Sequence, residues 1–281
     1  MFKHFLLAST AVAALATTAM AADLPSRRVA PAPYVAVPVF TWTGFYIGAN
    51  AGYIFSDQGS INTFGNNGPA AGPSTIFNVA IGARPPVARL DPEGFTGGGQ
   101  VGYNYQFGNV VVGLEADAAY TDFAQTRGFL GTTGAISQFR TDMSFLGTVR
   151  GRLGYAYDRV MVYGTGGFAY GDVQHTGAFF ATPAAGGTGV TQFFGGRSRM
   201  ETGWTAGGGI EYALPTNFSL FNSSAVTLKA EALYYDLGRS SIVVGDTGFA
   251  PAATRGQSYT SRFDNTGVIA RAGLNFKFGG F

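Results

Sequence analysis

Charged and apolar residues alternate along short segments of this chain, and this alternation constrains the fold more than any other feature. In the segment Val110 to Thr121, Glu115 and Asp117 share one face. The opposite face carries only apolar and aromatic residues, namely Val110, Val112, Leu114, Ala116, Ala118 and Tyr120. Successive side chains of a strand point to opposite sides, so the segment is predicted to be a strand with one apolar face and one charged face.

Eight segments have the length that a tilted membrane strand needs, roughly 9 to 11 residues with some extension. They are Phe45 to Phe55, Phe95 to Phe107, Val110 to Thr121, Asp142 to Tyr157, Val160 to Asp172, Glu201 to Leu214, Ala225 to Leu237 and Asn265 to Phe278. The alternation does not orient the fifth of them. The connections are short at Gly108-Asn109 and Asp158-Arg159 and of moderate length at Pro215 to Ser224. Four others are long: Ser56 to Gly94, Asp122 to Thr141, Val173 to Met200 and Gly238 to Asp264. This pattern predicts an all-β fold, an eight-stranded antiparallel transmembrane β-barrel with short periplasmic turns and long extracellular loops.

The charged faces are predicted to point into the barrel, because Arg or Lys on the lipid face at the midplane costs about 2–4 kcal/mol. The predicted interior network contains Glu115, Asp117, Arg150, Arg152, Glu211, Lys229, Glu231, Arg271 and Lys277. Four acids against five bases suggest pairing. Because side chains can fill an eight-stranded barrel, such a network is expected to plug the bore and to exclude a wide diffusion channel.

A soluble sandwich is the competing interpretation, since its polar and buried faces alternate in the same way. Aromatic residues near the ends of the apolar faces favour the membrane barrel, where they form interfacial girdles. They are Tyr53, Tyr103, Tyr105, Tyr155, Tyr212, Tyr234 and Phe278.

Composition supports a membrane protein that crosses with strands. The chain is 46% hydrophobic and only 12% charged, yet no stretch after Ala22 reaches the length of a spanning helix. Cysteine is absent, which excludes disulfides and thiol chemistry. The formal net charge of +2 is too small to suggest nucleic-acid binding.

The N-terminus has the organisation of a secretory signal peptide. Lys3 and His4 precede an apolar run, and Ala19-Met20-Ala21 offers a cleavage pattern of small residues. A membrane helix is the alternative, but the run is short for one. We therefore expect a signal peptide over residues 1–21, cleaved after Ala21 or Ala22. A Pro-rich periplasmic segment over 22–41 and a barrel over 42–281 are expected to follow.

Several segments resemble the alphaproteobacterial outer-membrane surface antigens, a porin-like family of small barrels that includes haemin-binding and root-nodule outer-membrane proteins. They are Phe40-Thr41-Trp42-Thr43-Gly44-Phe45-Tyr46-Ile47-Gly48, Gly99-Gln100-Val101-Gly102-Tyr103-Asn104-Tyr105-Gln106, Gly147-Thr148-Val149-Arg150-Gly151-Arg152-Leu153-Gly154-Tyr155, Gly203-Trp204-Thr205-Ala206-Gly207-Gly208-Gly209-Ile210-Glu211-Tyr212 and Arg271-Ala272-Gly273-Leu274-Asn275-Phe276-Lys277-Phe278.

The resemblance covers nearly the whole chain and implies a place in the outer membrane of a Gram-negative bacterium. It also implies contact with lipopolysaccharide and recognition of the C-terminal strand by the barrel-assembly machinery. In the family's C-terminal signal, the final aromatic is in phase with the outward residues. Here Leu274, Phe276 and Phe278 are in phase with one another, whereas Phe281 is not. Either Phe278 ends the signal, or Gly279 and Gly280 allow a bulge.

The sequence offers no catalytic, cofactor-binding or metal-binding set. Gly97 to Gly102 matches G-x-G-x-x-G, but a strand follows it where a phosphate-binding helix would be needed. His175 is the single histidine after the signal peptide, and it is expected at the surface of a long loop. The sequence thus favours a structural, non-enzymatic barrel that stabilises the envelope and displays loops. The alternatives are a narrow pore, a haemin receptor with His175 or Tyr259 as axial ligand, and an enzyme that uses His175 as base.

Overall fold

A computed structural model describes residues 40–57, 59–68, 72–181, 189–215 and 225–279, all within the compact unit Phe40–Phe281. The expected signal peptide and nearly all of the expected Pro-rich segment lie outside these residues. The elements in chain order are β1 (Gly44–Ser56), β2 (Ser60–Gly65), α2 (Thr75–Ala80), β3 (Val87–Arg89), β4 (Glu93–Phe107), β5 (Val110–Leu130), β6 (Ile136–Tyr157), β7 (Val160–Phe180), β8 (Thr191–Ala213), β9 (Ala225–Asp246), the 3-10 helix η2 (Ala252–Thr254) and β10 (Ser258–Phe278).

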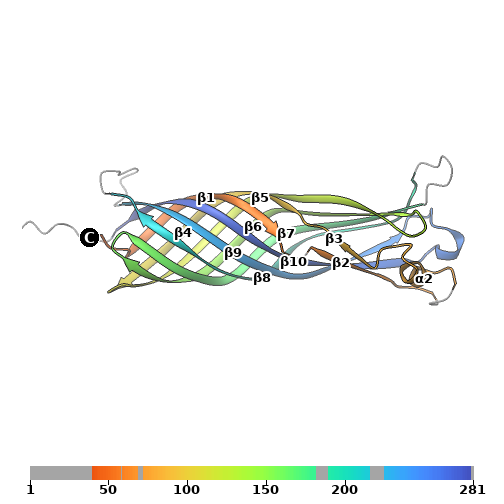
Figure 1. Cartoon of the computed structure of the whole chain (residues 1–281), viewed down its shortest axis with the longest axis horizontal. Helices are drawn as coiled ribbons and strands as arrows, with labels where there is room; N and C mark the ends of the chain where they lie inside the picture. The colour runs from red at the N-terminus through yellow and green to blue at the C-terminus, as the bar shows by residue number, and fades with distance from the viewer. Residues whose placement is uncertain (1–39, 58, 69–71, 182–188, 216–224, 280–281) are drawn as a thin grey trace, which may run out of the picture. The chain divides into compact units, whose positions relative to one another are not determined.

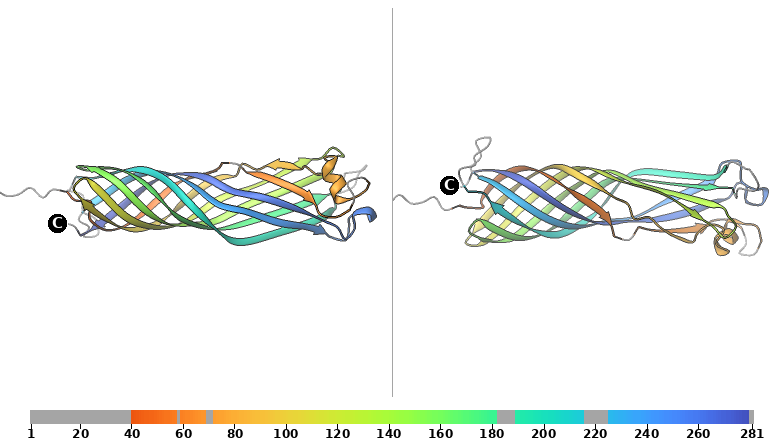
Figure 2. Two further views of the ribbon diagram at one scale, coloured as in Figure 1. Left: turned by 90° about the horizontal axis from the view of Figure 1, so that it is seen from below. Right: turned by 45° about the horizontal axis from the view of Figure 1, so that its top comes forward.

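Eight long strands close into an antiparallel ring, as the sequence predicted (Figure 1). Each strand from β4 to β9 pairs with the next along the chain, and β1 pairs with both β4 and β10. The closing register places Phe45 opposite Phe278. Figure 2 shows the strands winding obliquely around the barrel. No helix among the described residues has the length and apolar character needed to cross a membrane.

Two tight turns join strands at the end of the barrel opposite α2. Gly108 links β4 to β5 with φ of +61°, a left-handed conformation that glycine adopts without strain. Asp158 links β6 to β7 with φ of +50°, and aspartate is among the few other residues that tolerate it. Both turns fall where the sequence predicted them.

Three of the four long connections consist mostly of strand, a difference from the sequence-based boundaries. β5 continues to Leu130 and β6 begins at Ile136, so only residues 131–135 join them. The strands continue because inward-facing apolar residues such as Phe123 and Phe139 still have a core to fill. The connection between β1 and β4 is different, since it contains β2, α2 and β3, and β2 pairs with β10 beyond the end of β1.

With the tight turns at the bottom and α2 at the top, an apolar belt surrounds the lower part of the barrel. Large outward-facing side chains line its two rims, for example Tyr103 and Tyr155 near the tight turns, and Tyr120 and Trp204 further up. Above the upper rim the outward positions become charged. They carry Glu93, Asp122, Asp142, Asp172, Asp236 and Asp264. This change in polarity marks where the barrel leaves the apolar layer, as a lipid-facing surface requires.

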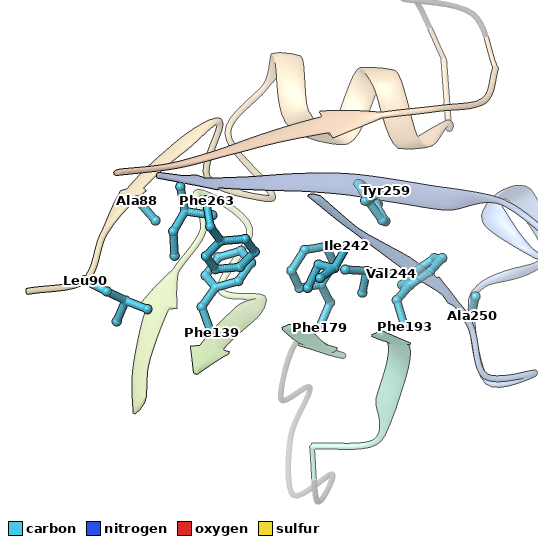
Figure 3. Close-up of a cluster of buried hydrophobic side chains, with 11 residues drawn as sticks. Ala88, Leu90, Phe139, Phe179, Phe193, Ile242, Val244, Ala250, Tyr259 and Phe263 are labelled. Carbon is cyan, nitrogen blue, oxygen red and sulfur yellow. The ribbon is translucent and has the colours of Figure 1, made fainter. Parts of the chain in front are cut away.

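The inside of the barrel is packed in layers. The lowest apolar layer contains Trp42, Val111, Ala156, Met161, Tyr163 and Ala213. The second, above the charged residues described below, contains Ile54, Phe123, Met143, Leu146, Ala169, Val173, Leu233, Tyr235, Leu237 and Ile269. The third fills the outer end around Phe139, Phe179, Phe193, Tyr259 and Phe263 (Figure 3). The barrel therefore has a filled interior.

Candidate functional site in the barrel interior

A carboxylate from β5 is at the centre of a buried charge network. Glu115 lies directly across the ladder from Arg150 on β6, and their side chains meet at 2.5 Å. Lys229, on the opposite wall in β9, reaches across the bore and donates to Glu115 at 2.9 Å and 3.1 Å. All three side chains have zero exposure. The network thus ties together strands that are not neighbours in the sheet.

Two further acids, Asp117 and Glu231, are each held by two arginines. Arg150 donates to Glu231 and to Asp117, both at 3.0 Å. Arg271 from β10 contacts Glu231 at 2.8 Å and Asp117 at 2.9 Å. Multiple hydrogen bonds to each charge are what allow such groups to remain ionised away from water.

The fourth acid of the network is Glu211, on the side nearest the tight turns. Arg152 donates to Glu211 at 2.7 Å and to Glu115 at 3.3 Å. Its guanidinium also lies 3.9 Å from the ring centre of Tyr163. The phenol of Tyr163 donates to Glu231 at 3.0 Å. On the opposite wall, the phenol of Tyr46 donates to Glu115 at 2.8 Å.

Eight of the nine residues in the predicted network meet in this cluster: Glu115, Asp117, Arg150, Arg152, Glu211, Lys229, Glu231 and Arg271. Lys277 is buried but lies nearer the tight turns, where it donates to the carbonyls of Thr43 at 2.6 Å and Gly279 at 3.1 Å. Its inward direction is the one that the sequence predicted. It faces the interior, but the end of β10 puts it below the charge cluster.

Two tyrosines and a tryptophan of the interior were not predicted. Neither Tyr46 nor Tyr163 was predicted, because a tyrosine on a strand fits the interfacial girdle as well as the interior. The alternation in β1 offered a signal for Tyr46, since it is in phase with Asn50 and out of phase with Phe45. Trp42 precedes β1 and turns into the barrel mouth, where it is 1% exposed and its Nε1 donates to the carbonyl of Asp158 at 3.2 Å.

The described part of the connection between β2 and β3, residues 66–68 and 72–86, packs on the outer end. Arg84 from this connection is 4% exposed and donates to the carbonyls of Ile136 and Phe180, both at 2.8 Å. Its guanidinium also lies 5.1 Å from the ring centre of Phe179. One arginine thus joins the ends of β6 and β7 over the third apolar layer.

His175 is buried, which corrects the expectation of a surface histidine. It lies on β7 above the apolar belt, whose upper rim on this strand is at Phe168, and it is 2% exposed. Its ring stacks on Phe263 with centroids 4.1 Å apart. Nδ1 lies 3.1 Å from Thr141 Oγ1, and Nε2 lies 2.9 Å from Asn265 Oδ1. Because β7 continues past the predicted end at Asp172, the side chain enters the barrel.

Burial should keep His175 neutral to low pH. Desolvation lowers the pKa of His175 from 6.5 to about 4, although Asn265 opposes the shift. The unfolded chain binds this proton more readily, so the histidine's contribution to stability is complete above pH 6.5 and is lost as pH falls towards 4. We expect NMR of the imidazole, in refolded protein beginning at Ala22, to give a titration midpoint near 4. A midpoint near 6.5 would contradict the enclosed geometry.

The chain matches the family model described as outer membrane protein beta-barrel domain over residues 7–276. It is 36% identical to the 31 kDa outer-membrane immunogenic protein of Brucella melitensis biotype 1, over 98% of this chain and all of that protein. The chain belongs to the outer membrane protein beta-barrel family. A 22 kDa outer membrane protein of Rhizobium leguminosarum bv. viciae is 28% identical over 65% of this chain and 62% of its own length. Among solved structures, OprG from Pseudomonas aeruginosa is similar, with 14% identity, a TM-score of 0.40, and coverage of 85% of this chain and 97% of that chain.

Family membership locates this outer-membrane barrel in the cell outer membrane of a Gram-negative bacterium. The chain is thus an outer-membrane β-barrel, as the resemblance implied. The apolar belt is then the lipid-facing surface, and the end that carries α2 is the extracellular end, since the tight turns face the periplasm.

Proposed function

We propose that this barrel is a sealed structural element that stabilises the envelope and displays its outer end, and that it does not conduct ions. The observation that carries the proposal is the charge network, because its eight side chains bridge opposite walls at the level of the membrane. Apolar layers lie on both sides of the network. Ions would have to break paired charges and cross the apolar layers of the bore.

Conductance in a planar bilayer tests the proposal directly. Refolded protein should first show the heat-dependent gel mobility of an intact barrel. We expect no unit conductance steps from such protein, while a general porin added to the same bilayer should give them. Reproducible steps from the heat-modifiable protein would instead support the narrow pore that the sequence left open.

A haemin receptor has less support. The two candidate axial ligands, His175 and Tyr259, are 2% and 0% exposed. Both nitrogens of His175 have hydrogen-bond partners, and the phenol of Tyr259 accepts a hydrogen bond from Asn78. Haem binding at either residue would require the buried side chains at the outer end of the barrel to move apart.

We also propose that the protein has no enzymatic activity. The nearest approach to a catalytic set that we identify among the described residues is the chain of side-chain contacts from Thr141 through His175 to Asn265. These residue types could serve, in that order, as a nucleophile, a base and an orienting group. The cavity beside Thr141 and Asn265 is about 30 Å³, roughly the space of one or two water molecules. A substrate bond therefore has no room next to Thr141.

We further propose that the barrel-assembly machinery recognises the end of β10 through Phe278. Phe278 is the last residue of β10 and pairs with Phe45, after which Gly279 turns the chain with φ of +78°. We expect Phe278→Ala to lower the amount of heat-modifiable protein in the outer membrane of cells severalfold. Removal of the last two residues, 280 and 281, should have little effect. The reverse order of effects would assign the signal to Phe281.

A further inference from the structure

The barrel wall is interrupted at one place above the membrane. The ladder between β8 and β9 runs up to Trp204 and Asp236, stops, and resumes at Phe194 and Gly245. Over the same stretch β8 stays paired with β7, and most of β9 stays paired with β10. The edges that face each other across the interruption therefore lack regular backbone pairing, although both strands continue (Figure 1). Buried backbone groups require a partner, and the carbonyl of Ser241 on β9 has one in Arg197, which donates to it across the interruption at 3.3 Å.

Two arginines of β8 lie at this interruption. Arg197 and Arg199 are opposite His175 and Val173 on β7, two residues that point into the barrel. Those two are 2% and 4% exposed, whereas Arg197 is half-buried and Arg199 is exposed. The interior side of the wall is thus accessible from outside at these two arginines.

The local charge favours an anion. Arg197 and Arg199 are two residues apart on one face of a strand, so their Cα atoms are about 7 Å apart and both guanidinium groups can reach one phosphate. Glu201 shares that face, but Ser240 donates to its carboxylate at 3.0 Å. Arg239, across the interruption, is paired with Asp264 at 2.6 Å. This face of β8 therefore carries two positive charges against one negative charge, and the neighbouring Asp172 and Asp236 lie on the outward face of the wall.

The site is continuous with the membrane surface. Trp204 and Tyr234, with ring centroids 5.5 Å apart, form the upper rim of the apolar belt directly below the interruption. Met200, between this rim and the arginines, is 50% exposed. A ligand with acyl chains in the outer leaflet and a phosphorylated head above them would contact both regions together.

We propose that the β8–β9 interruption binds the phosphorylated headgroup of an outer-leaflet glycolipid, with Arg197 and Arg199 as the phosphate ligands. In the outer membrane this partner is lipopolysaccharide. The proposal depends on the location of the barrel and is independent of whether its bore conducts.

Binding of fluorescent diphosphorylated lipid A to the refolded, heat-modifiable protein in zwitterionic detergent tests the proposal. We expect Arg197→Gln with Arg199→Gln to weaken binding about tenfold, as the loss of charge-assisted contacts to phosphate predicts. The matched control is Arg140→Gln with Arg262→Gln, which removes the same charge from outward-facing positions on β6 and β10. The control should bind as the unmodified protein does.

Three results would overturn the assignment. Equal losses in the two double variants would show that only overall charge matters. If dephosphorylated lipid A binds as tightly as the diphosphorylated form, the protein does not recognise the phosphate. Displacement of the lipid by millimolar inorganic phosphate would make free phosphate, and not the glycolipid, the ligand of the arginines.

Discussion

Arg150→Met is expected to lower the free energy of unfolding by about 3–5 kcal/mol, the typical cost of removing one partner from a buried ion network. Arg150 has zero side-chain exposure and contacts Glu115, Asp117 and Glu231 within 3.0 Å. Methionine fills much of the same volume but leaves these carboxylates short of one positive charge. Urea unfolding of the protein in lipid vesicles measures the change.

An exposed ion pair provides the control. Arg140 lies 2.7 Å from Asp142, but 54% of its side chain is exposed, so Arg140→Met should cost less than about 1 kcal/mol. A second comparison isolates the charge effect. Arg150→Met combined with Glu231→Gln removes one charge of each sign, and the loss should be smaller than the sum of the two single losses. Strict additivity would argue that the charges of the network do not interact.

Gly102→Val is expected to cost about 3 kcal/mol or more, through overpacking and the loss of hydrogen bonds to charged groups. Gly102 faces the interior, and a Cβ atom at this position would overlap the phenol of Tyr46. That phenol donates to Glu115 and accepts from Arg152 at 2.7 Å. The valine would displace Tyr46 from the network. The yield of heat-modifiable protein after refolding and its stability in urea both report the effect.

Gly99→Val is the matched control on the same strand. Gly99 faces the lipid, and the nearest atom to an added Cβ is the carbonyl oxygen of Gly48 at 3.7 Å. We expect a change within about 0.5 kcal/mol, as for a surface substitution. If both valines destabilise the barrel equally, the loss reflects the strand itself and not the space kept for Tyr46.

Part of the interior could be predicted because charge is expensive in lipid. Glu115, Arg150 and Lys229 each alternate with apolar neighbours, and the lipid face excludes them, so their direction follows from the sequence. Their pairing was suggested by the near balance of signs. The choice of partners was not predictable, because Lys229 meets Glu115 from the opposite wall, and that distance depends on how the strands are staggered around the ring.

The height of Lys277 and the burial of His175 could not be predicted, for the same reason. Lys277 and the interior acids alternate alike, and only the height of each residue in the closed barrel separates them. His175 lies beyond the membrane, where polar outward residues weaken the apolar signal that marks a strand. The sequence cannot reveal that β7 continues there, because the reason is the apolar interior supplied by other strands.

The sequence by itself determined the number of long strands, the inward and outward faces of most of them, the tight turns and the family, since each depends on alternation or on local motifs. The tertiary structure decided what fills the bore, how far the strands extend above the membrane, and where the wall between β8 and β9 is interrupted. These features depend on contacts between residues distant in the chain. Such contacts form only when the ring closes and sets the register of every strand against its neighbours.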